Sequence, residues 1–295
     1  MVKDYLKAIR IGNLFLLSLL FWGFKGLLIN SSIFVLELDF ILLFCAIVLT
    51  ASSGYLINDY YDVDSDKLNS YKSKSSLSES QLLRLSILHS IVAVLVIGFT
   101  DLNQSWIVLI LLTNLLLYLY SWKLQHLPLV GNLVVATLCG LVMIVPLIFD
   151  HDINGLWEIE FNLTTINGIC WTYTLFAFLL TLLREVIKDG EDIVGDQAVE
   201  SKTLAVVAGL RPTKVVCLLI TLLTIITVGS ISFLELSKNI SFLTVLFPSL
   251  ILIPLSYFLI QLKKSNKSTD FSKLSLHLKV VFLGASIWVY LKLML

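Results

Sequence analysis

Charged residues are scarce in this chain of 295 residues, because aspartate, glutamate, lysine and arginine together make up 14% of it. An ordinary soluble domain carries about 25% charged residues, so the composition argues against a soluble enzyme or a disordered tail. The 21 basic and 21 acidic residues cancel, and no excess charge favours a nucleic-acid partner. The mean hydropathy of +0.91 instead indicates a polytopic membrane protein.

Cysteine and histidine are equally few, with four of each. The cysteines lie inside apolar runs without C-x-x-C spacing, which favours small buried thiols over a disulfide framework or a zinc site. The histidines are scattered and lack the spacing of metal ligands. We therefore expect neither residue type to carry the chemistry of this protein.

Nine apolar stretches are long enough to cross about 30 Å of hydrocarbon as helices. They lie near residues 13–30, 38–57, 82–100, 105–121, 131–149, 166–183, 213–232, 241–262 and 275–294. No linker rich in glycine and proline separates them. The sequence thus predicts an all-α membrane protein with a single domain over residues 1–295.

Basic residues lie almost entirely on one side of these spans. That side holds the N-terminus and four connections, at residues 58–81, 122–130, 184–212 and 263–274. The lysines assigned to the other side are Lys25, Lys238 and Lys292. The positive-inside rule makes the basic side cytoplasmic, in the cell membrane or an inner membrane.

A first acidic cluster, at residues 58–66, continues the second span into its cytoplasmic connection. On a helix, Asn58 or Asp59 lies on the same face as Asp62 and Asp66. Like charges on one face repel each other, and a bound divalent cation relieves that repulsion. Carboxylate and amide oxygens select Mg²⁺ over Zn²⁺, and Mg²⁺ takes further ligands from water and substrate phosphates.

A second acidic cluster follows the sixth span, and its carboxylates again share one helical face: Glu185, Asp189, Asp192 and Asp196. Two such faces on one side of the membrane are suited to two Mg²⁺ ions with a diphosphate. Nearby basic residues would supply cationic contacts to phosphate oxygens: Arg184, Lys188, Lys202, Lys123, Lys72 or Lys74. The alternative is that each cluster is a solvated helix end.

The two clusters resemble the motifs of the UbiA-type family of intramembrane prenyltransferases. The first family motif is N-D-x-x-D-x-x-x-D, which is matched by Asn58, Asp59, Asp62 and Asp66. The second is D-x-x-D with a trailing aspartate in some branches, which is matched by Asp189, Asp192 and Asp196. The nine predicted spans and the spacing between the motifs agree with the same family.

Within that family, residues 118–124 and 128–132 are similar to the Y-S-x-x-L-K and P-L-x-G-N segments of the digeranylgeranylglyceryl phosphate synthase branch. That branch transfers a geranylgeranyl group to a prenylated glycerol phosphate. Two departures stand out. Many members have Arg-Pro shortly after the first motif, where this chain has Lys72 and Lys74, and Ile11 follows Arg10 where an R-P-x-N pattern often has proline.

The resemblance implies a UbiA-like bundle of nine transmembrane helices with both acidic motifs at its cytoplasmic mouth. It implies Mg²⁺ as cofactor, an allylic prenyl diphosphate as donor, a lipid or aromatic acceptor, and contact with membrane lipids. Metal ligation is expected of Asn58, Asp59, Asp62, Asp66, Asp189, Asp192 and Asp196. Catalytic roles are expected of Asp62, Asp189, Lys188 and Tyr120. Substrate contacts are expected of Asn58, Arg184, Lys123, Lys202, Lys72, Tyr118 and Asn132.

Several alternatives remain open at this point. Tyr118 and Tyr120 are suited to stabilising an allylic cation, but tyrosine at a membrane interface is commonly a belt residue. Asn132 binds substrate or bridges helices. The acceptor is a prenylated glycerol phosphate or an aromatic compound of quinone or chlorophyll-type biosynthesis. A cation transporter or channel is a more remote alternative, which predicts ion flux without a prenylated product.

Overall fold

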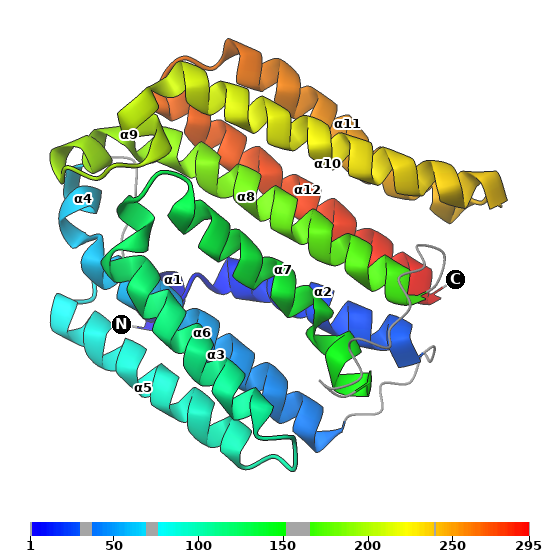
Figure 1. Ribbon diagram of the computed structural model, residues 1–295, viewed down its shortest axis with the longest axis horizontal. Helices are drawn as coiled ribbons and strands as arrows, with labels where there is room; N and C mark the ends of the chain where they lie inside the picture. Colours follow the sequence, from blue (N-terminus) through cyan, green and yellow to red (C-terminus); the bar gives the residue numbers. More distant parts are fainter. Residues whose placement is uncertain (1, 30–36, 69–75, 152–165, 239, 295) are drawn as a thin grey trace. The chain divides into compact units, whose positions relative to one another are not determined.

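The computed structural model describes residues 2–29, 37–68, 76–151, 166–238 and 240–294. Every regular element in these ranges is a helix (Figure 1). Nine of the helices are long and apolar enough to cross a membrane: α2 (Ile11–Ile29), α3 (Leu38–Tyr61), α5 (Glu79–Gly98), α6 (Ser105–Trp122), α7 (Val130–His151), α8 (Ile166–Ala198), α10 (Leu210–Lys238), α11 (Phe242–Lys264) and α12 (Ser268–Met294). The predicted fold class and its spans are thereby confirmed.

Four short helices were not predicted from the hydropathy pattern, because each is far shorter than the length needed to cross a membrane. They are α1 (Val2–Ala8), α4 (Val63–Leu68), the 3-10 helix η1 (Leu124–His126) and α9 (Leu204–Ala208). Large apolar side chains such as Leu112, Ile226 and Ile253 are more than half exposed on the long helices. This exposure is expected of helices that face lipid tails.

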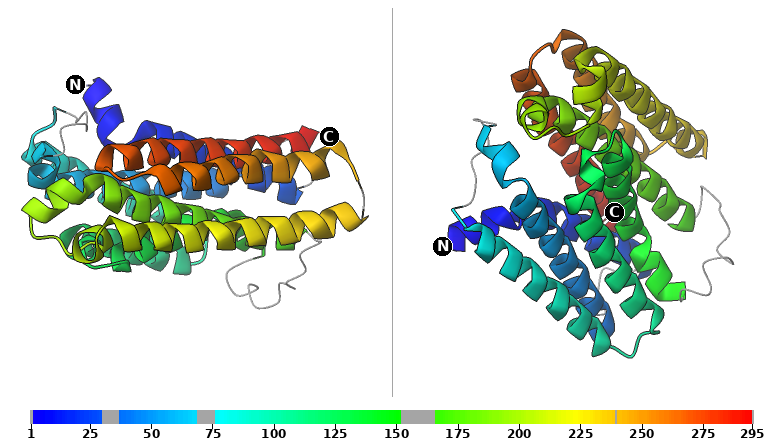
Figure 2. Two further views of the ribbon diagram at one scale, coloured as in Figure 1. Left: turned by 90° about the horizontal axis from the view of Figure 1, so that it is seen from above. Right: turned by 60° about the vertical axis from the view of Figure 1, so that its left-hand side comes forward.

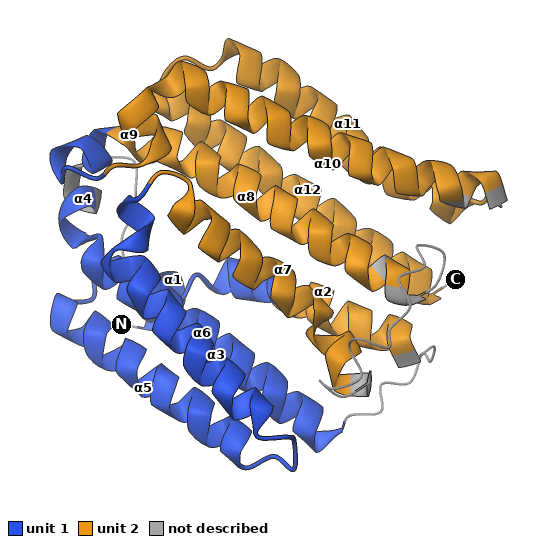
Figure 3. Ribbon diagram, in the orientation of Figure 1, with its two compact units in different colours: residues 1–17, 35–127, 194–201 blue, residues 18–34, 128–193, 202–295 orange. Residues whose placement is uncertain are grey.

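The contacts within the chain divide it into two compact units (Figure 3). Unit 1 contains residues 1–17, 35–127 and 194–201, and unit 2 contains residues 18–34, 128–193 and 202–295. The first acidic motif therefore belongs to unit 1, and Asp189 and Asp192 of the second belong to unit 2. The single domain expected over residues 1–295 stays a prediction.

In unit 1, α3 is the central helix and packs against α5 and α6. Gly54 permits a close approach to α6, since a Cβ atom there would lie 3.0 Å from Leu117. The three helices are also joined by a ladder of polar side chains inside the membrane-spanning part. The Ser53 hydroxyl forms hydrogen bonds with the hydroxyls of Ser86 and Ser90, and the Ser90 hydroxyl donates a hydrogen bond to Asn114. Such bonds fix the register of helices where apolar packing alone does not.

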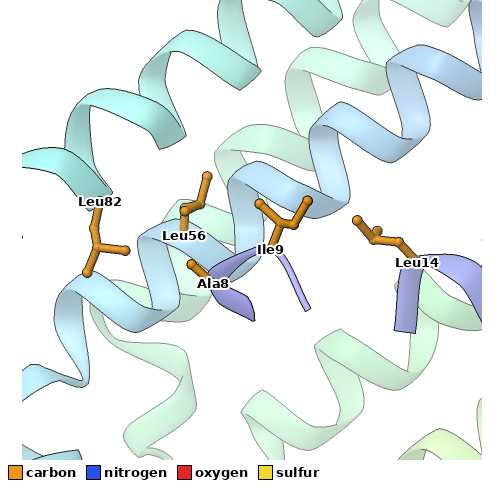
Figure 4. Packing of buried hydrophobic residues seen from close by; sticks show 5 residues of the cluster. All are labelled: Ala8, Ile9, Leu14, Leu56 and Leu82. Atoms are coloured by element: carbon orange, nitrogen blue, oxygen red, sulfur yellow. The ribbon is translucent and has the colours of Figure 1, made fainter. Parts of the chain in front are cut away.

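A small apolar cluster attaches the start of the chain to α3. Its members are Ala8, Ile9, Leu14, Leu56 and Leu82, all buried (Figure 4). Ala8, Ile9 and Leu14 come from the junction of α1 and α2, and Leu56 comes from α3. The junction is thereby held beside the end of α3 that carries the first motif.

In unit 2, α11 packs against both α10 and α12 (Figure 2). Tyr173 of α8 is the centre of a buried aromatic cluster, with its ring 4.9 Å from Phe24, 5.8 Å from Phe247 and 5.7 Å from Trp288. Aromatic rings at these separations add to the stability given by burial. This cluster ties together α2, α8, α11 and α12.

The close packing of α12 on α11 yields a prediction. A Cβ atom at Gly284 would lie 2.9 Å from the backbone oxygen of Leu250, which a side-chain rotation cannot relieve. Gly284→Ala should therefore lower the free energy of unfolding by about 1–3 kcal/mol. Gly229 of α10 has no atom within 4 Å of such a Cβ, so Gly229→Ala should be neutral or slightly stabilising. Thermal unfolding in detergent checks both, and a Gly284→Ala protein as stable as wild type would contradict the packing.

Candidate functional site

The first acidic motif lies where α3 ends. Asn58 and Asp59 are in its last turn, and Asp62 follows as the C-cap residue with φ −89° and ψ 0°. The helix is interrupted there, and α4 begins at Val63. The helical face expected for the motif is therefore divided at Asp62 between α3 and α4. Aspartate is a weak helix former and neighbouring carboxylates repel each other, so ending α3 at Asp62 relieves both costs.

Three side chains close a ring of hydrogen bonds around the motif. Asn58 Nδ2 donates to Asp62 Oδ2 at 2.9 Å and to Gln125 Oε1 at 2.7 Å. Gln125 Nε2 donates in turn to Asp62 Oδ1 at 2.9 Å. Asn58 is buried, so its amide is held inside the protein. Gln125 was not among the predicted site residues, although it occupies the final position of the Y-S-x-x-L-K pattern, where that pattern has a lysine.

Arg10 brings a positive charge to the same motif. Its Nη2 donates to Asn58 Oδ1 and to Asp59 Oδ1, both at 3.1 Å. Its guanidinium carbon lies 4.7 Å from the centre of the Tyr55 ring, one turn earlier on α3. Arg10 itself sits between α1 and α2 with a φ of 52°. Arg10 was not among the predicted site residues, although the sequence around it departs from a family pattern at Ile11.

The second acidic motif lies on α8, which continues unbroken to Ala198 as its spacing predicted. Asn132 of α7 is buried, and its Nδ2 donates to Asp189 Oδ2 at 3.2 Å. This contact joins two residues that were predicted to belong to the site. Gly190, beside Asp189, faces the Phe271 ring of α12 so closely that a Cβ atom would lie 2.5 Å from it.

The remaining predicted residues keep their roles as predictions. Arg184 forms an ion pair of 2.8 Å with its neighbour Glu185. Tyr118 is exposed and accepts a hydrogen bond of 3.3 Å from Tyr61. The burial of the other predicted residues varies: Tyr120 and Lys188 are half-buried, Lys123 and Lys202 are exposed, and Asp192 is buried. Lys72 and the side chain of Asp66 lie outside the described residues.

The oxygen donors of the first motif fit Mg²⁺. Asn58, Asp59 and Asp62 offer one amide and two carboxylates, with no sulfur or imidazole. In the described part of the chain, no three aspartate, glutamate, histidine or cysteine side chains gather into a ready metal cage. Mg²⁺ does not need one, because it keeps several waters and binds through one or two carboxylates plus substrate phosphates.

The sequence of the chain was compared with those of known protein families. A sequence profile described as the UbiA prenyltransferase family matches residues 16–283. The chain belongs to the UbiA prenyltransferase family. It is therefore a membrane-embedded prenyltransferase, in agreement with the two acidic motifs and the nine apolar helices of the described residues.

Two curated relatives are both named digeranylgeranylglyceryl phosphate synthase. The protein from Saccharolobus solfataricus is 34% identical over 234 residues, which cover 77% of this chain and 76% of the relative. The protein from Thermococcus kodakarensis is 32% identical over 206 residues, which cover 68% of this chain and 66% of the relative. The chain therefore spans about two thirds to three quarters of these relatives.

A solved structure of a UbiA homolog from Archaeoglobus fulgidus, bound to DMAPP and Mg²⁺, has the same fold. It superposes with a TM-score of 0.62 at 15% identity, covering 96% of this chain and 99% of the homolog. The fold predicted from the resemblance is thus confirmed.

The positive φ of Arg10 allows the effect of its backbone conformation on stability to be distinguished from the effect of its guanidinium on activity. Arg10→Ala and Arg10→Gly both remove the guanidinium and should weaken prenyl transfer to a similar degree. Alanine keeps a Cβ atom in the left-handed region, so Arg10→Ala should be less stable than Arg10→Gly by about 1 kcal/mol. Thermal unfolding in detergent measures the difference, and an alanine variant as stable as the glycine variant would refute it.

Proposed function

We propose that this protein transfers a long-chain prenyl group from an allylic diphosphate to a prenylated glycerol phosphate, with Mg²⁺ as cofactor. The cluster of oxygen donors at the end of α3, beside the guanidinium of Arg10, carries this proposal. Bound Mg²⁺ would neutralise the diphosphate and make it a better leaving group. Asn58, Asp59 and Asp62 would hold the metal in unit 1, together with Asp66.

The second motif is proposed to bind Mg²⁺ as well. Asp189, Asp192 and Asp196 are proposed metal ligands, and the hydrogen bond from Asn132 orients Asp189. Cationic side chains would contact the phosphate oxygens: Arg10, Arg184, Lys188, Lys123, Lys202 and Lys72. Tyr118 and Tyr120 are proposed to face the allylic cation. The apolar helices would bury the isoprenoid chain and keep water from the cation.

The reaction breaks the bond between the allylic carbon and the diphosphate oxygen. A hydroxyl oxygen of the acceptor forms the new C–O bond and loses its proton, and diphosphate leaves. The names of both relatives favour a glycerol phosphate acceptor over an aromatic compound of the quinone or chlorophyll type. The distribution of lysine and arginine favours a cytoplasmic position for both motifs.

The proposed metal ligands are tested by substitution. Asp62→Ala and Asp189→Ala should each lower the rate of geranylgeranyl transfer by about 100-fold or more, because each removes a group that stabilises the departing diphosphate. Radiolabelled product formation in detergent, with saturating Mg²⁺, measures the rate. Asp101→Ala is the matched control, since Asp101 is exposed in the turn that follows α5. Near-normal turnover by either motif variant would refute the assigned role.

A further inference from the structure

Both polar groups of the Gln125 side chain, its carbonyl oxygen and its amide nitrogen, form hydrogen bonds. Its Oε1 accepts from Asn58 at 2.7 Å, and its Nε2 donates both to Asp62 Oδ1 at 2.9 Å and to the carbonyl oxygen of Ser121 at 2.9 Å. Only a side chain that donates and accepts at once can bridge an asparagine N–H and a carboxylate. Glutamine meets this requirement without bringing any charge.

The absence of charge on Gln125 matters for Asp62. A carboxylate has about four lone-pair sites, and each Asp62 oxygen accepts one bond in the ring, from Asn58 or from Gln125. A lysine in place of Gln125 would bring a positive charge to the Asp62 carboxylate, whereas the amide of Gln125 orients Asp62 and adds no charge.

Gln125 is itself held from two directions. The Ser121 carbonyl fixes its Nε2, and the next residue of η1, His126, has its Nδ1 3.0 Å from Ser201 Oγ. Burial lowers the pKa of His126, so its imidazole is neutral at neutral pH. The backbone N–H of Ser201 donates to the carbonyl of Asp196 at 2.9 Å. Within unit 1, η1 thereby links the first motif to the end of α8.

We propose that Gln125 is a positioning residue, which fixes the Asn58 amide and the Asp62 carboxylate in the orientation that binds a divalent cation. This inference rests on the proposed function, in which the cation is Mg²⁺. Removing Gln125 would leave both ligands in place but free to turn. Partners of metal ligands that act in this way commonly change metal affinity by about 10- to 100-fold.

The experiment is a titration of the purified full chain in detergent with Mn²⁺ alone, with free Mn²⁺ measured by electron paramagnetic resonance. Gln125→Met keeps the length of the side chain but removes its hydrogen bonds. Its Mn²⁺ dissociation constant should rise about 10- to 100-fold while thermal unfolding in EDTA is unchanged. Gln104→Met is the matched control, because Gln104 is exposed at the other end of α6 and makes no capping bond. It should bind Mn²⁺ as wild type does.

A double-mutant cycle tests whether Gln125 acts through Asp62. In an Asp62→Ala background, which removes the bond from Gln125 to Asp62, Gln125→Met should raise the dissociation constant less than it does in the wild type, because only the bond to Asn58 remains to be lost. Wild-type affinity in Gln125→Met, or an undiminished second loss in the Asp62→Ala background, would overturn the positioning role. If Gln125→Met lowers the unfolding temperature, Gln125→Asn, which keeps the amide on a shorter side chain, should show the same loss of affinity.

The same measurements separate this inference from the proposed function. Wild-type protein that binds no Mn²⁺ and forms no prenylated product would contradict both. Wild-type protein that binds Mn²⁺ and transfers prenyl groups, beside a Gln125→Met variant of unchanged affinity, would refute the positioning role alone.

Discussion

Negative charge held at the end of an apolar helix is the constraint on which unit 1 depends. Asn58, Asp59 and Asp62 must stay together for chemistry, yet neighbouring carboxylates repel each other in the absence of a metal. Three features of the structure reduce this cost. The helix ends at Asp62, neutral amides satisfy the Asp62 oxygens, and the Arg10 guanidinium lies beside Asp59. These contacts hold Asn58, Asp59 and Asp62 beside one another in unit 1.

The packing around α3 holds the end of that helix in place. The approach of Gly54 to Leu117, and the bonds of Ser53 to Ser86 and Ser90, fix α3 against its neighbours. The apolar cluster around Leu56 fixes the junction that carries Arg10. Packing of apolar side chains, which supplies most of the contact in such helices, thus acts here to orient a few polar groups.

In unit 2, too, a neutral side-chain amide contacts a carboxylate of an acidic motif. Asp189 is joined by the buried amide of Asn132, and the adjacent Gly190 brings α8 against the Phe271 ring of α12. A neutral amide thus contacts one carboxylate in each motif, Gln125 for Asp62 and Asn132 for Asp189. In both cases the amide adds a donor without cancelling the charge that a cation would need.

The spans and the acidic residues were predictable from the sequence because their signals are local: runs of apolar residues, and carboxylates at helical spacing. The contacts that orient the site were not. Gln125 lies 63 residues from Asp62, and Arg10 lies 49 residues from Asp59, so no local pattern reports either pair. Helical spacing could not report the boundary between α3 and α4 at Asp62, because such spacing describes an ideal helix and not the repulsion within it. Asn132 was selected as a candidate because a polar amide just inside an apolar span is conspicuous, and the structure shows its contact with Asp189.

Product analysis of the wild-type protein tests prenyl transfer most directly. Purified protein would be incubated with geranylgeranyl diphosphate and two competing acceptors, geranylgeranylglyceryl phosphate and a hydroxylated aromatic acid, with either Mg²⁺ or EDTA, and the products identified by mass spectrometry. We expect an ether-linked product from the glycerol phosphate, formed with Mg²⁺ and absent with EDTA. A prenylated aromatic product would contradict the proposed acceptor, and Mg²⁺-independent transfer would contradict the role of the two acidic motifs.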